Sequence, residues 1–185
     1  MPRAARPKDS NWKRFPVDAA RTVDSFLQTP YDSAEPGPIE ASYQAMSTVP
    51  PDMYDRVEEL ALAIVGATEA GDDVLHEVHC QALREYYEEQ LGLGRSHPFL
   101  TEAMADYTID EREAARLYRL ALEQARDVPG ESTHTKAICL ADRLIELGQT
   151  EQAEAHLRDG RAEALRRGEM DWVQDADALL QKLPV

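Results

Sequence analysis

Short breaks between helix-forming segments are the feature of this sequence that most restricts its fold. From Pro51 onward, segments rich in Ala, Leu, Glu, Gln and Arg alternate with brief turns that contain Gly, Pro, Asp or Ser. The expected helices cover residues 51–70, 73–92, 99–107, 111–126, 133–147, 150–167 and 170–183. Connections this short join neighbouring helices into antiparallel hairpins. The sequence therefore predicts an all-α fold of stacked helical hairpins.

The chain divides by composition into two parts. Eight of the eleven prolines lie in residues 1–51, so we expect residues 1–50 to be a Pro-rich, partly disordered N-terminal segment with short helices over 17–28 and 39–47. Residues 51–185 are expected to form a single α-helical repeat domain. The apolar fraction of 43% is sufficient for a core in this domain.

Charge is distributed unevenly along the chain. Residues 1–21 contain six Lys or Arg and two Asp, whereas the remainder contains 14 basic and 33 acidic residues. Such a field repels nucleic acid, which is bound by placing Lys and Arg against phosphates, and it attracts a basic protein at long range. Acidity that merely keeps the protein soluble is the plainer alternative, and the sequence leaves it open.

The sequence also predicts where the protein is found. The longest apolar run, residues 60–67, is too short to span a membrane, and the N-terminus lacks the apolar region of a secretory signal. Two cysteines, Cys80 and Cys139, are too few for the disulfide framework of a small secreted protein. We therefore expect a cytoplasmic protein with no membrane partner.

Two of the expected hairpins share a pattern of apolar and small residues. A shift of about 40 residues aligns one hairpin with the next. The aligned pairs are Leu100 and Leu140, Met104 and Leu144, Ala114 and Ala153, Tyr118 and Leu157, and Ala121 and Gly160. Self-similarity of this kind is typical of stacked helical repeats.

The later copy, LADRLIELGQTEQAEAHLRDG, resembles the tetratricopeptide repeat family. The positions that carry the resemblance are Leu140, Ala141, Leu144, the turn glycine Gly148, Ala153, Leu157 and Gly160. The match is good over residues 140–160, fair over 99–125 and poor elsewhere, and the period exceeds the 34 residues of that family. The resemblance implies a short, irregular, tetratricopeptide-like α-solenoid whose last helix, with Trp172 and Val173, is a cap.

The resemblance also implies a binding face, because the first helix of each hairpin lines the concave side of such a stack. Transferred position by position, this face contains the expected protein-binding residues Glu102, Asp106, Thr135, Ile138, Asp142, Ile145 and Glu146. Carboxylates with isoleucines between them suit a protein surface rich in Lys and Arg. Ordinary solvated helix faces are the alternative.

One segment, VLHEVHCQALREYYEEQLG, gathers possible metal ligands, namely His76, Glu77, His79 and Cys80. On a helix the i+4 partner of His76 is Cys80 and Glu77 lies on the solvated side, so the H-E-x-x-H arrangement of metalloproteases is not formed. We predict no metal site here.

The same helix is expected to bury its apolar side. Val74 and Val78 would then face the core together with His79, a structural histidine. His76 and Cys80 would lie at helix-packing positions.

No motif in the chain indicates an enzyme or a cofactor. Gly92 and Gly94 lie between helices rather than after a strand, and residues 130–136 lack the pattern of a phosphate-binding loop. We expect a non-enzymatic, acidic protein-binding module, most concretely an immunity or antitoxin protein that neutralises a basic toxic effector. A tetratricopeptide-type adaptor or secretion chaperone that binds an extended peptide is one alternative, and a metal-dependent enzyme that uses His76 and Cys80 is another.

Overall fold

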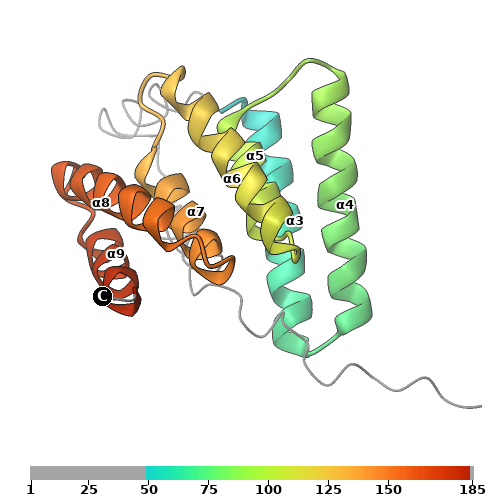
Figure 1. The fold of residues 1–185 in the computed structure, drawn as a ribbon. Helices are drawn as coiled ribbons and strands as arrows, with labels where there is room; N and C mark the ends of the chain where they lie inside the picture. Colours follow the sequence, from blue (N-terminus) through green and yellow to red (C-terminus); the bar gives the residue numbers. More distant parts are fainter. Residues whose placement is uncertain (1–48, 184–185) are drawn as a thin grey trace, which may run out of the picture.

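The computed structural model describes residues 49–183, and within this range it consists of helices and turns without a strand (Figure 1). The helices are α3 (Pro51–Ala70), α4 (Asp73–Gly92), α5 (Pro98–Asp106), α6 (Glu111–Arg126), α7 (His134–Glu146), α8 (Thr150–Arg167) and α9 (Met170–Lys182). The predicted all-α class is confirmed, and every boundary lies within one residue of its expected place. The predictions for residues 1–48 lie outside the described residues.

Several helix ends form where the sequence supplies capping groups. The Asp72 carboxylate accepts a hydrogen bond from the backbone N–H of Leu75 at the start of α4, and Asp110 does the same for Glu113 at the start of α6. Helix α3 ends at Gly71 with φ 66°, a left-handed conformation that glycine adopts without strain. Capping chemistry therefore explains why the starts of α4 and α6 and the end of α3 could be predicted, whereas α7, α8 and α9 begin without a side-chain cap.

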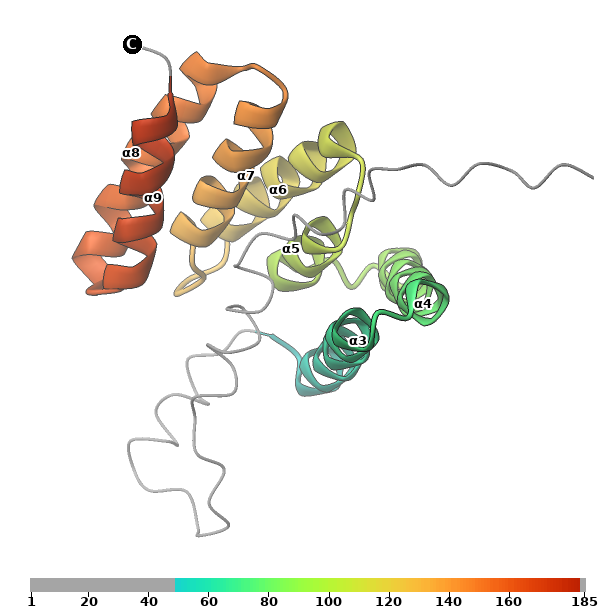
Figure 2. The ribbon, with the colours of Figure 1, turned by 90° about the horizontal axis from the view of Figure 1, so that it is seen from below.

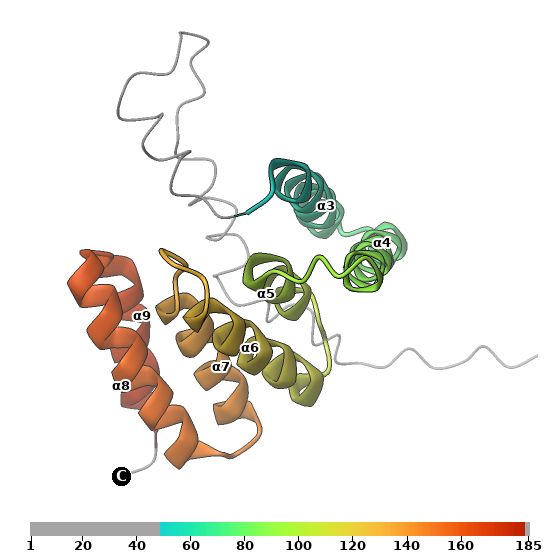
Figure 3. The same ribbon diagram turned by 90° about the horizontal axis from the view of Figure 1, so that it is seen from above.

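The helices pack in chain order, each against the next (Figure 2). Helices α5 to α9 form a continuous series, whereas the α3–α4 hairpin contacts the rest of the molecule mainly through α5. Figures 2 and 3 both place α4 at one edge of the molecule and α8 and α9 at the opposite edge. One long side of α4 is consequently left without a neighbouring helix within the described residues.

The positions aligned between the two hairpins form the core of the later helices. Every member of the five pairs is buried, including Tyr118 and Leu157. Gly160 has a specific function, because a Cβ added there would lie 2.8 Å from Ile138 Cγ1 and 3.2 Å from the His134 carbonyl oxygen. The missing side chain allows α7 and α8 to approach closely.

Within residues 49–183, no helix combines the length and the apolar character that crossing a bilayer requires.

Candidate protein-binding surface

The carboxylate of Glu102 on α5 is held by two residues of α7. It accepts hydrogen bonds from Thr135 Oγ1 and from Lys136 Nζ, both over 2.7 Å. Lys136 also bonds Glu131 over 2.9 Å, and its side chain is only 1% exposed. The predicted proximity of Glu102 and Thr135 is thus present, but a lysine of the chain itself already neutralises the carboxylate.

Asp106, at the end of α5, is buried beside Tyr118 of α6. The tyrosine hydroxyl donates a hydrogen bond to Asp106 Oδ1 over 2.5 Å. Burial, followed by repulsion from Glu102, raises the pKa of Asp106 from 3.8 to about 8. Most Asp106 carboxyls are therefore protonated in neutral solution, and this residue does not present a charge to a partner.

The remaining predicted residues of α7 divide between core and surface. Ile138 is 1% exposed and packs against α8 at Gly160, which corrects the expectation that it lies in an open groove. Asp142 and Ile145 are partly buried, and burial raises the pKa of Asp142. Glu146 is exposed. Helix α7 thus offers a partner less charge and less apolar surface than the sequence predicted.

Two basic residues that this prediction omitted explain the difference. Lys136 and Arg143 are the Lys and Arg residues of α7, and Arg143 pairs with Glu111 of α6 over 3.2 Å. They are seven residues apart, so two helical turns place them on nearly the same side of α7. That spacing was the available signal, but the positions transferred from the family did not include Lys136 or Arg143.

Unpaired negative charge is concentrated instead on the α3–α4 hairpin. Residues 51–92 contain eleven acidic residues and two arginines. Asp52 pairs with Arg95 and Glu59 with Arg56, while Asp72 caps α4. Eight other acids of the hairpin form no ion pair within residues 49–183, namely Asp55, Glu58, Glu69, Asp73, Glu77, Glu85, Glu88 and Glu89.

Helix α4 is rotated relative to the prediction. Its buried residues are His76, Leu83, Tyr87 and Gln90, with Cys80 half-buried between them. The spacing of four, three, four and three residues is the narrow seam of a helix that packs against a single partner. The exposed side contains Val74 (76% exposed), Leu75 (43%) and Val78 (55%).

The two histidines of α4 differ in burial. His76 is buried, as its expected helix-packing position requires, whereas His79, which we expected in the core, is only partly buried. Apolar residues are a poor guide to the buried side of this helix because α4 lies at the edge of the fold and has α3 as its main neighbour.

His76 and Cys80 lie close together, with Cys80 Sγ 3.7 Å from His76 Nε2. Burial, followed by repulsion from Glu77, raises the pKa of Cys80 to about 12, so the thiol stays protonated in neutral solution. A protonated thiol is a poor metal ligand and a poor nucleophile. Among residues 49–183, no group of three or more His, Cys, Asp or Glu side chains is placed to hold a metal ion.

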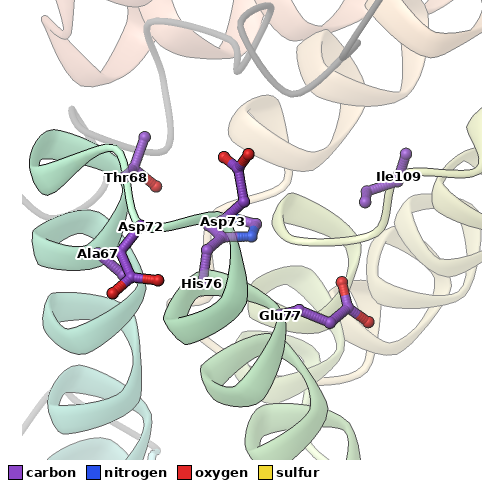
Figure 4. Close-up of a pocket in the computed structure, with 7 residues that line it drawn as sticks. All are labelled: Ala67, Thr68, Asp72, Asp73, His76, Glu77 and Ile109. Carbon is purple, nitrogen blue, oxygen red and sulfur yellow. The ribbon is translucent and has the colours of Figure 1, made fainter. Parts of the chain in front are cut away.

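An open pocket of about 220 Å³ lies at the turn between α3 and α4 (Figure 4). Asp73, His76 and Glu77 of α4 line it together with Thr68 of α3 and with Ile109 from the segment between α5 and α6. Carboxylates beside an aliphatic side chain suit the head and stem of a Lys or Arg side chain. The pocket adjoins the exposed N-terminal half of α4.

Comparisons of the chain with models of protein families, with curated proteins and with solved structures gave no match. The tetratricopeptide resemblance of residues 140–160 therefore stays a prediction from the sequence. The function has to be inferred from the chemistry of the surfaces described above.

Proposed function

We propose that this chain is a non-enzymatic protein-binding module and that its partner is a basic protein. The observation that carries this proposal is the charge of the α3–α4 hairpin, where eight of eleven acidic residues form no ion pair within residues 49–183. In the later helices, by contrast, carboxylates such as Glu102 and Glu131 are paired with bases of the same chain. Charge that is unpaired in the free protein steers a cationic partner and stabilises the encounter.

The most concrete form of the proposal is an immunity or antitoxin protein held against a toxic effector. An effector that acts on nucleic acid needs a cationic surface to bind phosphates. An acidic protein that covers this surface blocks access of the substrate without any catalytic chemistry. The exposed apolar side chains beside the acids of α4 would add the buried area that a stable complex needs.

We also propose that the later helices form a tetratricopeptide-like α-solenoid with α9 as its cap. The burial of all five aligned pairs supports this arrangement, as does the packing of the helices in chain order. Lys136 of α7 is buried and bonds Glu102 of α5, and Arg143 of α7 is buried and pairs with Glu111 of α6. Because bases of the chain itself already pair with these carboxylates, a partner bound at α3–α4 is favoured over an extended peptide bound between α5 and α7.

The proposal is tested by identifying the partner through chemical crosslinking in the source cells and reconstituting the complex from purified components. We expect a partner of net positive charge and an association rate that falls about tenfold or more from low to high salt. A partner of net negative charge, or a rate that salt does not change, would overturn the proposal.

Matched charge variants show which helices attract the partner. The triple variant Asp55→Asn, Glu58→Gln and Glu69→Gln removes three unpaired charges from α3 and should slow association. Its control, Glu151→Gln, Asp159→Asn and Asp171→Asn, removes three charges from exposed positions of α8 and α9 and should change the rate less. Equal effects of the two triple variants would exclude α3–α4 as the source of the attraction.

The immunity or antitoxin form of the proposal is tested by the activity of the partner. The catalytic activity of the reconstituted partner should be lost when the chain is added at equal concentration. Full activity within a formed complex would contradict the immunity function while leaving the binding function in place.

A further inference from the structure

The N-terminal half of α4 presents the densest group of exposed large apolar side chains in the described part of the chain. Val74 and Val78 are one helical turn apart, and Leu75 lies beside them. The views from below and from above both show α4 at the edge of the molecule (Figures 2 and 3). Exposed apolar groups of this kind mark interaction sites more often than isolated ones do.

Acidic side chains border this apolar group. Asp73 and Glu77 are one turn apart on the side of α4 that lines the pocket (Figure 4). Glu85 continues the outer side of the helix and accepts a hydrogen bond from Gln81 over 3.1 Å. None of these three carboxylates has an ion-pair partner within residues 49–183.

The exposed apolar side chains and the carboxylates beside them determine which kind of partner can bind to α4. A second copy of the chain would bring two hairpins together, each with eleven acidic residues and two arginines, so like charges would face each other across the contact. A segment with apolar side chains flanked by Lys or Arg would instead bury the valines and satisfy the carboxylates. Charge complementarity therefore selects a basic amphipathic segment.

We infer that the outer face of α4, formed by Val74, Leu75 and Val78, is the docking surface for a partner segment that presents apolar side chains flanked by Lys or Arg. This inference rests on the proposed function and adds the surface and the chemistry of the bound segment. A flanking Lys or Arg places its aliphatic stem along Ile109 and its charged head between Asp73 and Glu77. The valines contact the apolar side of the segment.

The test uses the full chain and a fluorescein-labelled synthetic peptide with leucines on one helical face and lysines on the other. A second peptide, with glutamate at every lysine position, is the control ligand. We expect the lysine peptide to bind with salt-dependent affinity and the glutamate peptide not to bind. In methyl spectra, the lysine peptide should shift the Val74, Leu75 and Val78 signals and leave those of Leu165 and Met170 in place.

Two double variants separate docking on α4 from general attraction. Val74→Ser with Val78→Ser should keep the thermal stability, because both side chains are exposed, and should weaken binding of the lysine peptide about tenfold or more. Leu165→Ser with Met170→Ser removes two exposed apolar side chains from α8 and α9 and should leave binding unchanged.

Each contrary result identifies which idea fails. If Val74→Ser with Val78→Ser binds the lysine peptide as tightly as the parent chain does, the docking surface is wrong, and the proposed function is still judged by the reconstituted partner. If the lysine peptide does not bind at all, the inferred segment chemistry is wrong. If sedimentation shows a dimer that Val74→Ser with Val78→Ser dissociates, the face is a contact between copies and the inference is overturned.

Discussion

Tyr118 on α6 donates a hydrogen bond to Asp106 on α5, and this buried pair connects the two helices of one hairpin. Burial raises the pKa of Asp106 to about 8, with Glu102 adding repulsion. Burial, followed by the charge of Asp106, also raises the pKa of Tyr118, so the tyrosine remains a donor at all ordinary pH values. Asp106, which the sequence predicted to be a protein-binding residue, thus has a structural role in the fold.

Replacement of Asp106 by Asn should change the pH dependence of stability. The folded-state pKa of Asp106 is above the unfolded value of 3.8. Its stabilising contribution is therefore complete below pH 3.8 and is lost as the pH rises through about 8. Asp106→Asn stays neutral. Urea unfolding at several pH values should show its free energy of unfolding rising relative to that of the parent chain by about 1.4 kcal/mol for each pH unit between 3.8 and about 8.

The control for this prediction is Asp171→Asn, which changes an exposed carboxylate of α9. Its unfolding free energy should follow that of the parent chain across the same pH range. Parallel curves for Asp106→Asn and the parent chain would show that Asp106 is ionised in the folded protein.

Replacement of Tyr118 by Phe should destabilise the protein by about 1–3 kcal/mol, because Asp106 is then buried without its donor. The measurement is urea unfolding of Tyr118→Phe, of Asp106→Ala and of the double variant. Alanine has no side-chain acceptor, so both changes remove the same hydrogen bond and the two losses should not add. Additive losses would show that the bond contributes nothing to stability.

Replacement of Lys136 by Met should cost about 3–5 kcal/mol, because two carboxylates would remain in a largely buried site without their cation. Although burial opposes it, the charges of Glu102 and Glu131 raise the pKa of Lys136 in the folded protein. Adding Glu102→Gln and Glu131→Gln to Lys136→Met should recover much of the loss. Arg158→Met, which removes an exposed pair with Glu154, is the control and should change stability little. Equal losses for the two cations would contradict the prediction.

The helices and the buried repeat positions could be predicted from the sequence because they depend on local chemistry. Asp72 and Asp110 cap helices, Gly71 ends one, and the small residue Gly160 marks a close contact between two helices. These signals need no knowledge of which other helix lies nearby. The predicted helix boundaries were accordingly confirmed.

The candidate surface depends on long-range neighbours, and there the prediction was wrong in part. Apolar residues on α4 were expected to face the core, but α4 has one main neighbour and buries His76 rather than Val74 and Val78. On α7, the expected binding residue Ile138 is buried against α8. A sequence pattern shows that a helix has two different sides, but the number of neighbouring helices decides which side is exposed.

Alanine at Gly160 and at Gly66 should have opposite effects on stability, although both glycines lie within helices. At Gly160 the new Cβ would lie 2.8 Å from Ile138 Cγ1 and 3.2 Å from a backbone oxygen, so α7 and α8 must separate at a cost of about 1–3 kcal/mol. At Gly66 no atom lies within 4 Å of the added Cβ, and the higher helix propensity of alanine should stabilise the fold by about 0.5–1 kcal/mol.

Urea unfolding of the two alanine variants measures both effects under one condition. Ile138→Ala in the parent chain and in the Gly160→Ala background tests the mechanism, because alanine lacks the Cγ1 atom of the closest contact. The combined loss should therefore be smaller than the sum of the two single losses. Stabilisation by Gly160→Ala would show that α7 and α8 are not in close contact in solution. The proposed tetratricopeptide-like stack requires close contact between α7 and α8. The same result would therefore also remove the main structural support for that proposal.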